Sequence, residues 1–191
     1  AQIATVRTGA RRFLELIGRY GRDPVLNGIA AIMDHSEALA RKHVLSIPDG
    51  VYEAESYMDD DGVDAGKRVP ISVKVIVSGD EMTIDYSDIA EQVKGPINSG
   101  WFGGGQTTAR VAFKYLLGAG EMANEGTFRP LKLILPPGKI LSADPTAPMF
   151  MYPTPFPTVI DAVIKALEKA LPARVPGGHF GTHSGVRFYG R

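Results

Sequence analysis

Cysteine is absent from this 191-residue sequence, and so is any long apolar run. The missing thiols exclude disulfides, thiolate metal sites and a cysteine nucleophile, and they are compatible with a reducing cytoplasm. No apolar segment approaches the roughly 20 residues that a membrane helix needs, so no membrane is expected as a partner. The charges also balance, with 21 basic residues against 21 acidic ones. The sequence therefore gives no electrostatic reason to expect nucleic acid as a partner.

Generic catalytic motifs are missing as well. The sequence contains no HExxH, no G-x-S-x-G and no Ser-His-Asp order. What is present is ordinary for a globular protein: 44% hydrophobic and 22% charged residues, in a length that can bury a real core. The chain opens without Met, inside a helical pattern, and ends without a closing element. We therefore expect it to be part of a longer polypeptide.

Residues 1–48 are expected to form a helical hairpin. Apolar side chains recur at helical spacing through residues 3–20, and Gly21 follows where a left-handed C-cap would lie. A second helical pattern runs to Val44 before a Pro-Asp-Gly turn. Two antiparallel helices are the simplest interpretation.

Residues 49–90 are expected to form an antiparallel meander. Apolar and polar side chains alternate over residues 51–58, 69–77 and 82–86, which is the period of a strand. The charged or glycine-containing segments DDDG and SGDE separate these runs and supply the turns.

Residues 91–191 read as a glycine- and proline-rich α+β part. A helix is predicted between the threonine pair of GQTTAR and Gly118, and a strand follows over residues 131–135. Five prolines in residues 145–157 forbid a regular strand, and the apolar side chains there predict an extended connector pinned to the core. One more helix follows. The predicted fold class is α+β: two N-terminal helices, an antiparallel meander, and a mixed helix and strand region with a proline-rich connector.

The carboxylates of residues 59–62, with Glu55 and Asp64 nearby, are the ligand type that a hard cation prefers. The segment lacks the alternating spacing and the closing Glu of a calcium loop, and its composition is typical of a solvated turn. The sequence favours the turn, so no metal ligand is assigned in this chain.

Gly103, Gly104 and Gly105 directly precede the predicted helix. Bare backbone N–H groups and the helix dipole favour an anion at such a position. No Lys follows as in a P-loop, and no strand directly precedes as in a dinucleotide-binding turn. The glycines therefore form either a phosphate or carboxylate site, or a flexible turn that seats Trp101 and Phe102.

Four polar side chains lie among glycines and prolines: Asn98, Asn124, Glu125 and Arg129. Side chains in such settings often brace the backbone of their own loop. The functional alternative is that they orient a planar amide or carboxylate, for which Arg offers a two-pronged donor. The residues alone favour loop bracing.

His179 and His183 form the only close histidine pair. Their spacing would place both side chains on one face of a helix, but the neighbouring glycines disfavour a helix. No carboxylate lies nearby in sequence to complete a zinc site. The pair is kept as a candidate for contact with a substrate or intermediate.

Six segments, taken together, resemble the hydantoinase B family. This family includes the B-type subunits of ATP-dependent hydantoinases, the C-terminal half of 5-oxoprolinase, and subunits of acetone and acetophenone carboxylases. The segments are DHSEALARKHVLSIPDGVYEAESYMDDDG (34–62), ISVKVIVSGDEMTIDYSD (71–88), QVKGPIN (92–98), TARVAFKYLL (108–117), NEGTFRPLKLILPPG (124–138) and VIDAVIKALEKALPARVPG (159–177).

The resemblance implies a partner of the hydantoinase A type, which binds ATP and phosphorylates a carbonyl oxygen. The B-type subunit then handles hydrolysis of the activated cyclic amide, or carboxylation of the activated ketone. The resemblance also places divalent-metal ligands upstream of Ala1 and a glycine-rich part beyond Arg191. This chain would then be well under half of a cytoplasmic B-type subunit and inactive alone. A phosphorylated intermediate would strengthen the interpretation of Gly103–Gly105 and Arg129 as binding groups.

We favour an ATP-dependent cyclic-amide hydrolase over a carboxylase. A third hypothesis is a structural module whose helices and proline-rich segment serve assembly, with all chemistry elsewhere. A contribution to the active site predicts that at least two of four groups, namely Gly103–Gly105, Asn124, Arg129 and His179–His183, face one cavity. Burial of these groups against the core, or scatter over separate surfaces, supports the structural module.

Overall fold

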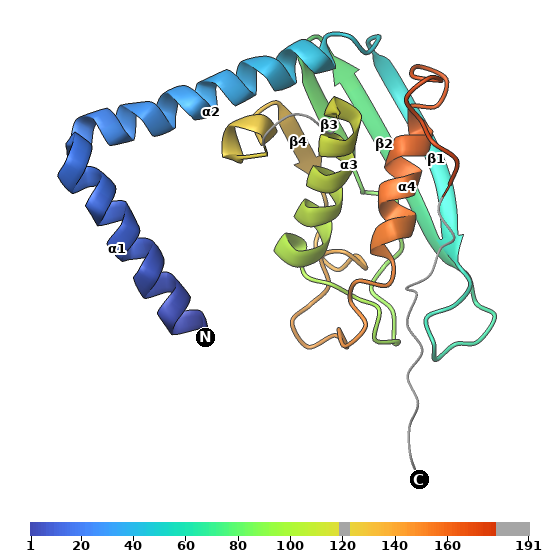
Figure 1. Cartoon of the computed structure of the whole chain (residues 1–191). Coiled ribbons are helices and arrows are strands. Elements are labelled where there is room, and N and C mark those ends of the chain that lie inside the picture. The colour runs from blue at the N-terminus through green and yellow to red at the C-terminus, as the bar shows by residue number, and fades with distance from the viewer. Residues whose placement is uncertain (119–122, 179–191) are drawn as a thin grey trace.

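The computed structural model describes residues 1–118 and 123–178 of the chain. These residues form four α-helices and one four-stranded sheet (Figure 1). In chain order the elements are α1 (Gln2–Tyr20), α2 (Arg22–Val44), β1 (Gly50–Met58), β2 (Val69–Ser78), β3 (Glu81–Asp85), the π-helical segment η1 (Trp101–Gln106), α3 (Thr107–Leu117), the 3₁₀ turn η2 (Glu125–Phe128), β4 (Leu131–Ile134) and α4 (Phe156–Ala166). The predicted α+β class is confirmed.

The sheet has the strand order β1-β2-β3-β4. The first three strands form the predicted antiparallel meander, with Ala54 opposite Val73 and Val75 opposite Ile84. Strand β4 then pairs parallel to β3, with Met82 beside Leu131. A parallel neighbour needs a long crossover connection, and this connection carries η1, α3 and η2.

Helices α3 and α4 cover one face of the sheet (Figure 1). The alternate residues of β2 that point to this side are buried because the strand period puts them on a single face. The core between the two layers includes Ile71, Val75 and Ile84 from the sheet and Phe113 and Val163 from the helices. Fully burying one such side chain stabilises a fold by about 1.5–3 kcal/mol.

The helical hairpin expected for residues 1–48 does not form. Both helices are present and meet at Gly21, which has φ 85° and ends α1 as predicted. Helix α1 nevertheless has no buried residue, and Figure 1 shows it turning away from α2 at an elbow. Only the second half of α2 is packed, through Ser36, Ala40 and Val44. The apolar periodicity of α1 was correctly assigned to a helix, but its apolar face does not pack on α2.

The start of α3 also differs from the expected capped terminus. Neither Thr107 nor Thr108 caps a helix, because α3 continues directly from η1. The Thr108 hydroxyl instead donates back to the carbonyl oxygen of Gly104, at 2.9 Å. The predicted stop at Gly118 is confirmed, with φ 103°.

The proline-rich connector is held to the core but is built of turns rather than extended chain. The backbone N–H of Met151 donates to the carbonyl oxygen of Pro96, at 2.8 Å, and the Met151 side chain packs against the core. Across the described ranges, every helix is too short or too polar to span a membrane.

Candidate functional site

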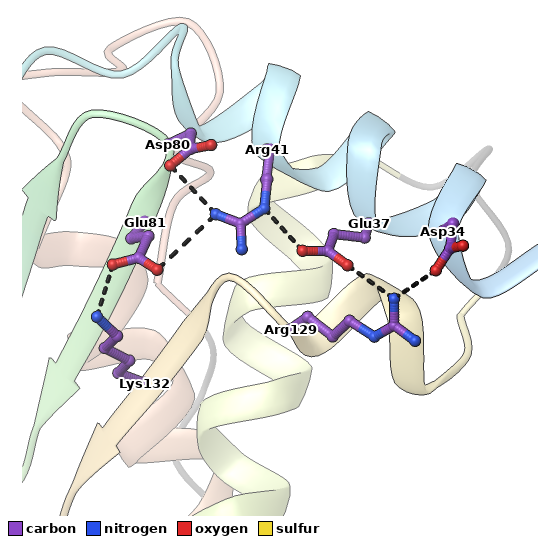
Figure 2. Close-up of polar contacts among 7 residues, drawn as sticks. All are labelled: Asp34, Glu37, Arg41, Asp80, Glu81, Arg129 and Lys132. Atoms are coloured by element: carbon purple, nitrogen blue, oxygen red, sulfur yellow. Dashed lines mark hydrogen bonds and ion pairs between the residues drawn. The ribbon is translucent and has the colours of Figure 1, made fainter. Parts of the chain in front are cut away.

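A network of ion pairs joins α2 to the β2–β3 turn and to the η2–β4 segment (Figure 2). We call it the α2 network; its members are Asp34, Glu37, Arg41, Asp80, Glu81, Arg129 and Lys132. The α-helical period places Asp34, Glu37 and Arg41 on one side of α2, since residues three and four apart share a face. The network therefore fixes the second half of α2 against two segments that are distant in sequence.

Arg41 lies at the centre of the α2 network. Its Nε donates to Glu37 at 2.9 Å, and its Nη1 lies 3.1 Å from Asp80. On the other side of Glu37, the Arg129 Nη1 donates to this carboxylate at 2.8 Å and to Asp34 at 2.7 Å. Hydrogen bonds from Arg129 and then from Arg41 hold the pKa of Glu37 below its ordinary value. Glu37 is thus an ionised bridge between two guanidinium groups.

Asn124 and Gly126 complete the contact between η2 and α2. The Asn124 side chain caps η2 by accepting from the N–H of Gly126 at 2.9 Å, and its amide donates to the Ser36 hydroxyl at 2.8 Å. A side chain at Gly126 would collide with the carbonyl oxygen of Met33, so only glycine permits this approach. Asn124 therefore fixes η2 against α2, which is the bracing role that its glycine-rich setting favours.

Asn98 is fully buried and has every polar atom of its side chain occupied. Its Oδ1 accepts from the N–H of Val93 at 2.8 Å. Its Nδ2 donates to the carbonyl oxygens of Val93, Gly95 and Pro148, at 2.8, 3.0 and 3.0 Å. The side chain thus satisfies backbone groups in two separate stretches of chain that lack regular secondary structure.

The three consecutive glycines lie inside η1 rather than in an open loop. The N–H of Gly104 donates to the carbonyl oxygen of Gly100 at 2.7 Å, and that of Gly105 donates to Leu141 at 3.2 Å. Gly104 and Gly105 are buried, whereas Gly103 is exposed and has open space at its Cβ position. The two buried glycines thus lack the bare N–H groups on which the anion-site interpretation was based.

The acidic loop after β1 supports itself through its own carboxylates. Asp61 is buried and accepts from the N–H groups of Val63, Asp64 and Gly95, at 2.9, 2.7 and 2.9 Å. These backbone hydrogen bonds, led by that from Asp64, lower the pKa of Asp61. The loop is more ordered than the predicted solvated turn. In residues 1–118 and 123–178, no three His, Asp or Glu side chains are grouped to hold a metal ion.

A cavity of about 300 Å³ lies between this loop and the segment that follows β3. Charged side chains of both signs line it, including Lys67, Arg68, Glu91 and Lys94. Lys94 is already paired with Asp64 at 3.1 Å. None of the sequence-predicted binding residues lines this cavity.

The described candidates fall into two groups. Asn124 and Arg129 flank η2 and both contact α2, whereas Asn98 and the buried glycines lie in the core near Leu141 and the proline-rich segment. Each has partners within its own chain. His179 and His183 lie outside the described residues. The geometry therefore indicates that these groups hold segments of this chain together, and their binding of a ligand stays a prediction.

Two features were missed by reasoning from sequence. One is the α2 network: Glu37 and Arg41 are four residues apart on a helix, but nothing in the sequence connects Arg41 with Asp80 in the β2–β3 turn. The other is the buried role of Asp61. The sequence shows it only as one member of an acidic turn, because Gly95, whose N–H donates to its carboxylate, lies 34 residues away.

Comparisons with known proteins point to one family. The family model described as Hydantoinase B/oxoprolinase matches residues 1–191, the whole chain. The B-type subunit of a D-/L-hydantoinase of Pseudomonas sp. (strain NS671) is 32% identical over 163 residues, which are 81% of this chain and 27% of that protein. The acetophenone carboxylase delta subunit of Aromatoleum aromaticum is 26% identical over 147 residues, which are 77% of this chain and 21% of that protein.

A solved structure agrees in fold. The ATP-dependent caprolactamase from Pseudomonas jessenii superposes with a TM-score of 0.81 at 30% identity, covering 91% of this chain and 30% of that chain. The present chain thus spans about a fifth to a third of the length of these relatives.

Proposed function

Because the chain belongs to the hydantoinase B/oxoprolinase family, we propose that it is part of the B-type subunit of an ATP-dependent cyclic-amide hydrolase. The A-type partner binds ATP and transfers its terminal phosphoryl group to the amide carbonyl oxygen of the substrate. The B-type subunit then directs water to the activated carbon, the ring C–N bond breaks, and phosphate leaves. The complex acts in the cytoplasm, where ATP is available.

One observation carries this choice of reaction: the match to caprolactamase at 30% identity over 91% of this chain. Caprolactam is a cyclic amide, and hydantoin, the substrate class named for the relative from Pseudomonas sp., is another. An amide is a poor electrophile, and phosphorylation of its oxygen lowers the barrier to attack by water. A closed pocket must then protect the phosphorylated species until the second step.

The role of this chain is to position the parts of such a pocket. Its described polar residues are engaged with each other, so they hold α2, η2 and the β2–β3 turn in fixed relation. The reacting groups, and a divalent metal if the reaction uses one, are contributed by the remaining parts of the subunit. Arg129 and the exposed Gly103 stay candidates for contact with the intermediate.

A carboxylase is the second candidate, because the acetophenone carboxylase delta subunit matches 77% of this chain. The two reactions are separated by assaying the complete complex with ATP. Ring opening of hydantoin, 5-oxoproline or caprolactam, with phosphate release and no need for bicarbonate, supports the hydrolase. Bicarbonate-dependent loss of acetone or acetophenone supports the carboxylase instead, and the absence of both activities contradicts the proposal.

A further inference from the structure

We propose that α1 and the first half of α2, residues 2–32, form an arm that docks into an apolar groove with an acidic rim, and that this groove belongs to the remaining polypeptide of the same subunit. The inference rests on the proposed function, because it takes the chain to be part of a longer B-type subunit.

Helix α1, the outer part of the arm, carries an apolar stripe with nothing over it in the described structure. On α1, Ile3, Val6 and Leu14 lie on one helical face and are 71%, 72% and 65% exposed. Beyond the elbow, Leu26 and Ile32 of α2 are further apolar side chains that are 40% and 55% exposed. Contiguous exposed apolar surface of this kind is typical of an interaction site.

A helix with such a face requires a partner. Helix α1 has 19 residues and no buried one, whereas most helical stability in proteins comes from the packing of an apolar face. Its two internal glycines, Gly9 and Gly18, further lower its intrinsic helix propensity. The apolar stripe of α1 is therefore the surface through which the helix is stabilised in the assembled protein.

The charges on α1 indicate the sign of the charge expected on its partner surface. Four arginines stand against a single acidic residue, Glu15, in a chain whose overall charge is balanced. Glu15 is shared by Arg11 and Arg12, at 3.7 and 2.9 Å. Within the part of the chain that the structure describes, neither Arg7 nor Arg19 has an ion pair. A groove that receives this helix is expected to present carboxylates at its rim.

The lengths of the relatives identify the occupant. The matched residues make up 27% of the D-/L-hydantoinase relative and 30% of the caprolactamase chain, so more than twice as much polypeptide accompanies them in each relative. The arm projects away from the described body, whereas α2 is fixed to that body from Met33 onward by η2 and the α2 network (Figure 1). An arm fixed at one end and apolar along its free part is suited to a neighbouring domain of its own subunit.

The test is hydrogen exchange of the α1 amides in the full-length B-type subunit without its ATP-binding partner. We expect exchange at least about 100-fold slower than in an unstructured chain, at all protein concentrations. Protection that appears only when the partner is added would overturn the proposal in favour of that partner. Protection that increases with protein concentration would overturn it in favour of a second copy, and lack of protection under every condition would overturn it outright.

A pair of variants separates the apolar stripe from helix formation in general. Leu14→Asp places a charge in the stripe, and we expect exchange of the α1 amides to accelerate about tenfold or more. Thr8→Asp places the same charge on the opposite face of α1 and should leave protection within about twofold, since exposed substitutions have small effects. Equal effects of the two variants would contradict docking through the stripe. Turnover of the complex is measured separately. If the α1 amides are protected but the complex shows no ATP-dependent ring opening, the proposed function is rejected while the docking of the arm stands.

Discussion

The side chain of Asn98 donates to the carbonyl oxygen of Pro148 at 3.0 Å, and so connects two loops that are fifty residues apart. The same amide also serves Val93 and Gly95. One buried side chain thus joins the segment after β3 directly to the proline-rich segment.

Replacing Asn98 should be strongly destabilising. Asn98→Ala leaves the Val93 N–H and several carbonyls buried without partners, and we expect a loss of about 2–4 kcal/mol in the free energy of unfolding, because each such group costs about 1–3 kcal/mol. Urea unfolding measures the loss. Asn27→Ala, at an exposed position of α2, is the matched control and should have little effect. A loss below about 0.5 kcal/mol for Asn98→Ala would show that the loops hold without it.

Gly126→Ala should separate η2 from α2. The new methyl group would collide with the backbone of Met33, which cannot move away as a flexible side chain does. We expect a cost of about 1–3 kcal/mol from overpacking, measured as a lower urea midpoint at unchanged slope. Gly28→Ala in α2 has open space at its Cβ position and should be neutral or slightly stabilising. Equal midpoints for the two variants would disprove the close approach.

The α2 network should make stability depend on acidity. The folded state lowers the pKa of Glu37 and of Glu81 from their ordinary value of 4.5. A lowered carboxyl pKa stabilises the fold above the unfolded-state value, and this contribution is lost as the pH falls through the lowered folded-state value. The melting temperature should therefore drop below about pH 4.5, and Glu37→Gln should reduce that drop. High salt should reduce the difference in melting temperature between the wild type and Glu37→Gln at neutral pH, since the network is partly exposed. If the melting temperatures of both proteins fall equally on acidification, Glu37 is not a source of the pH dependence.

Arg129→Ala tests whether this side chain also contacts an intermediate. Its guanidinium is engaged by Asp34 and Glu37, so we expect turnover of the complete complex within about threefold of the wild type, with a modest loss of thermal stability. Arg110→Ala, which removes a comparable ion pair with Glu125, is the control. A decrease of about 100-fold or more with normal assembly would place Arg129 in the active site, because that is the usual cost of removing one charge-stabilising donor.

Much of the fold could be predicted from the sequence, because period and turn chemistry act locally. The alternation in β2 and the glycine stops at Gly21 and Gly118 lie in the structure where they were expected. The packing of α1 could not be predicted in this way. An apolar face shows that a helix needs a partner but does not identify that partner, and α2 uses only its second half for the body.

Among the polar contacts too, those within a loop could be predicted from the sequence and those between distant segments could not. Loop bracing by Asn98 and Asn124 was favoured by their glycine-rich settings, and the structure shows the hydrogen bonds. The role of Gly104 and Gly105 was not visible, because the carbonyl that receives the Gly105 N–H belongs to Leu141, far along the chain. Contacts of this length depend on the assembled fold and have no local signature.

The parallel pairing of β4 with β3 has a consequence for the order of folding. The meander β1–β3 is made from neighbouring segments, so its closure costs little chain entropy. Strand β4 reaches its place only after the crossover from Asp85 to Leu131 has been closed, with α3 inside it. Long-range pairings of this kind form slowly. The β3–β4 hydrogen bonds should therefore be among the last to gain protection during refolding, and until then β3 is an open sheet edge through which two unfinished chains can associate.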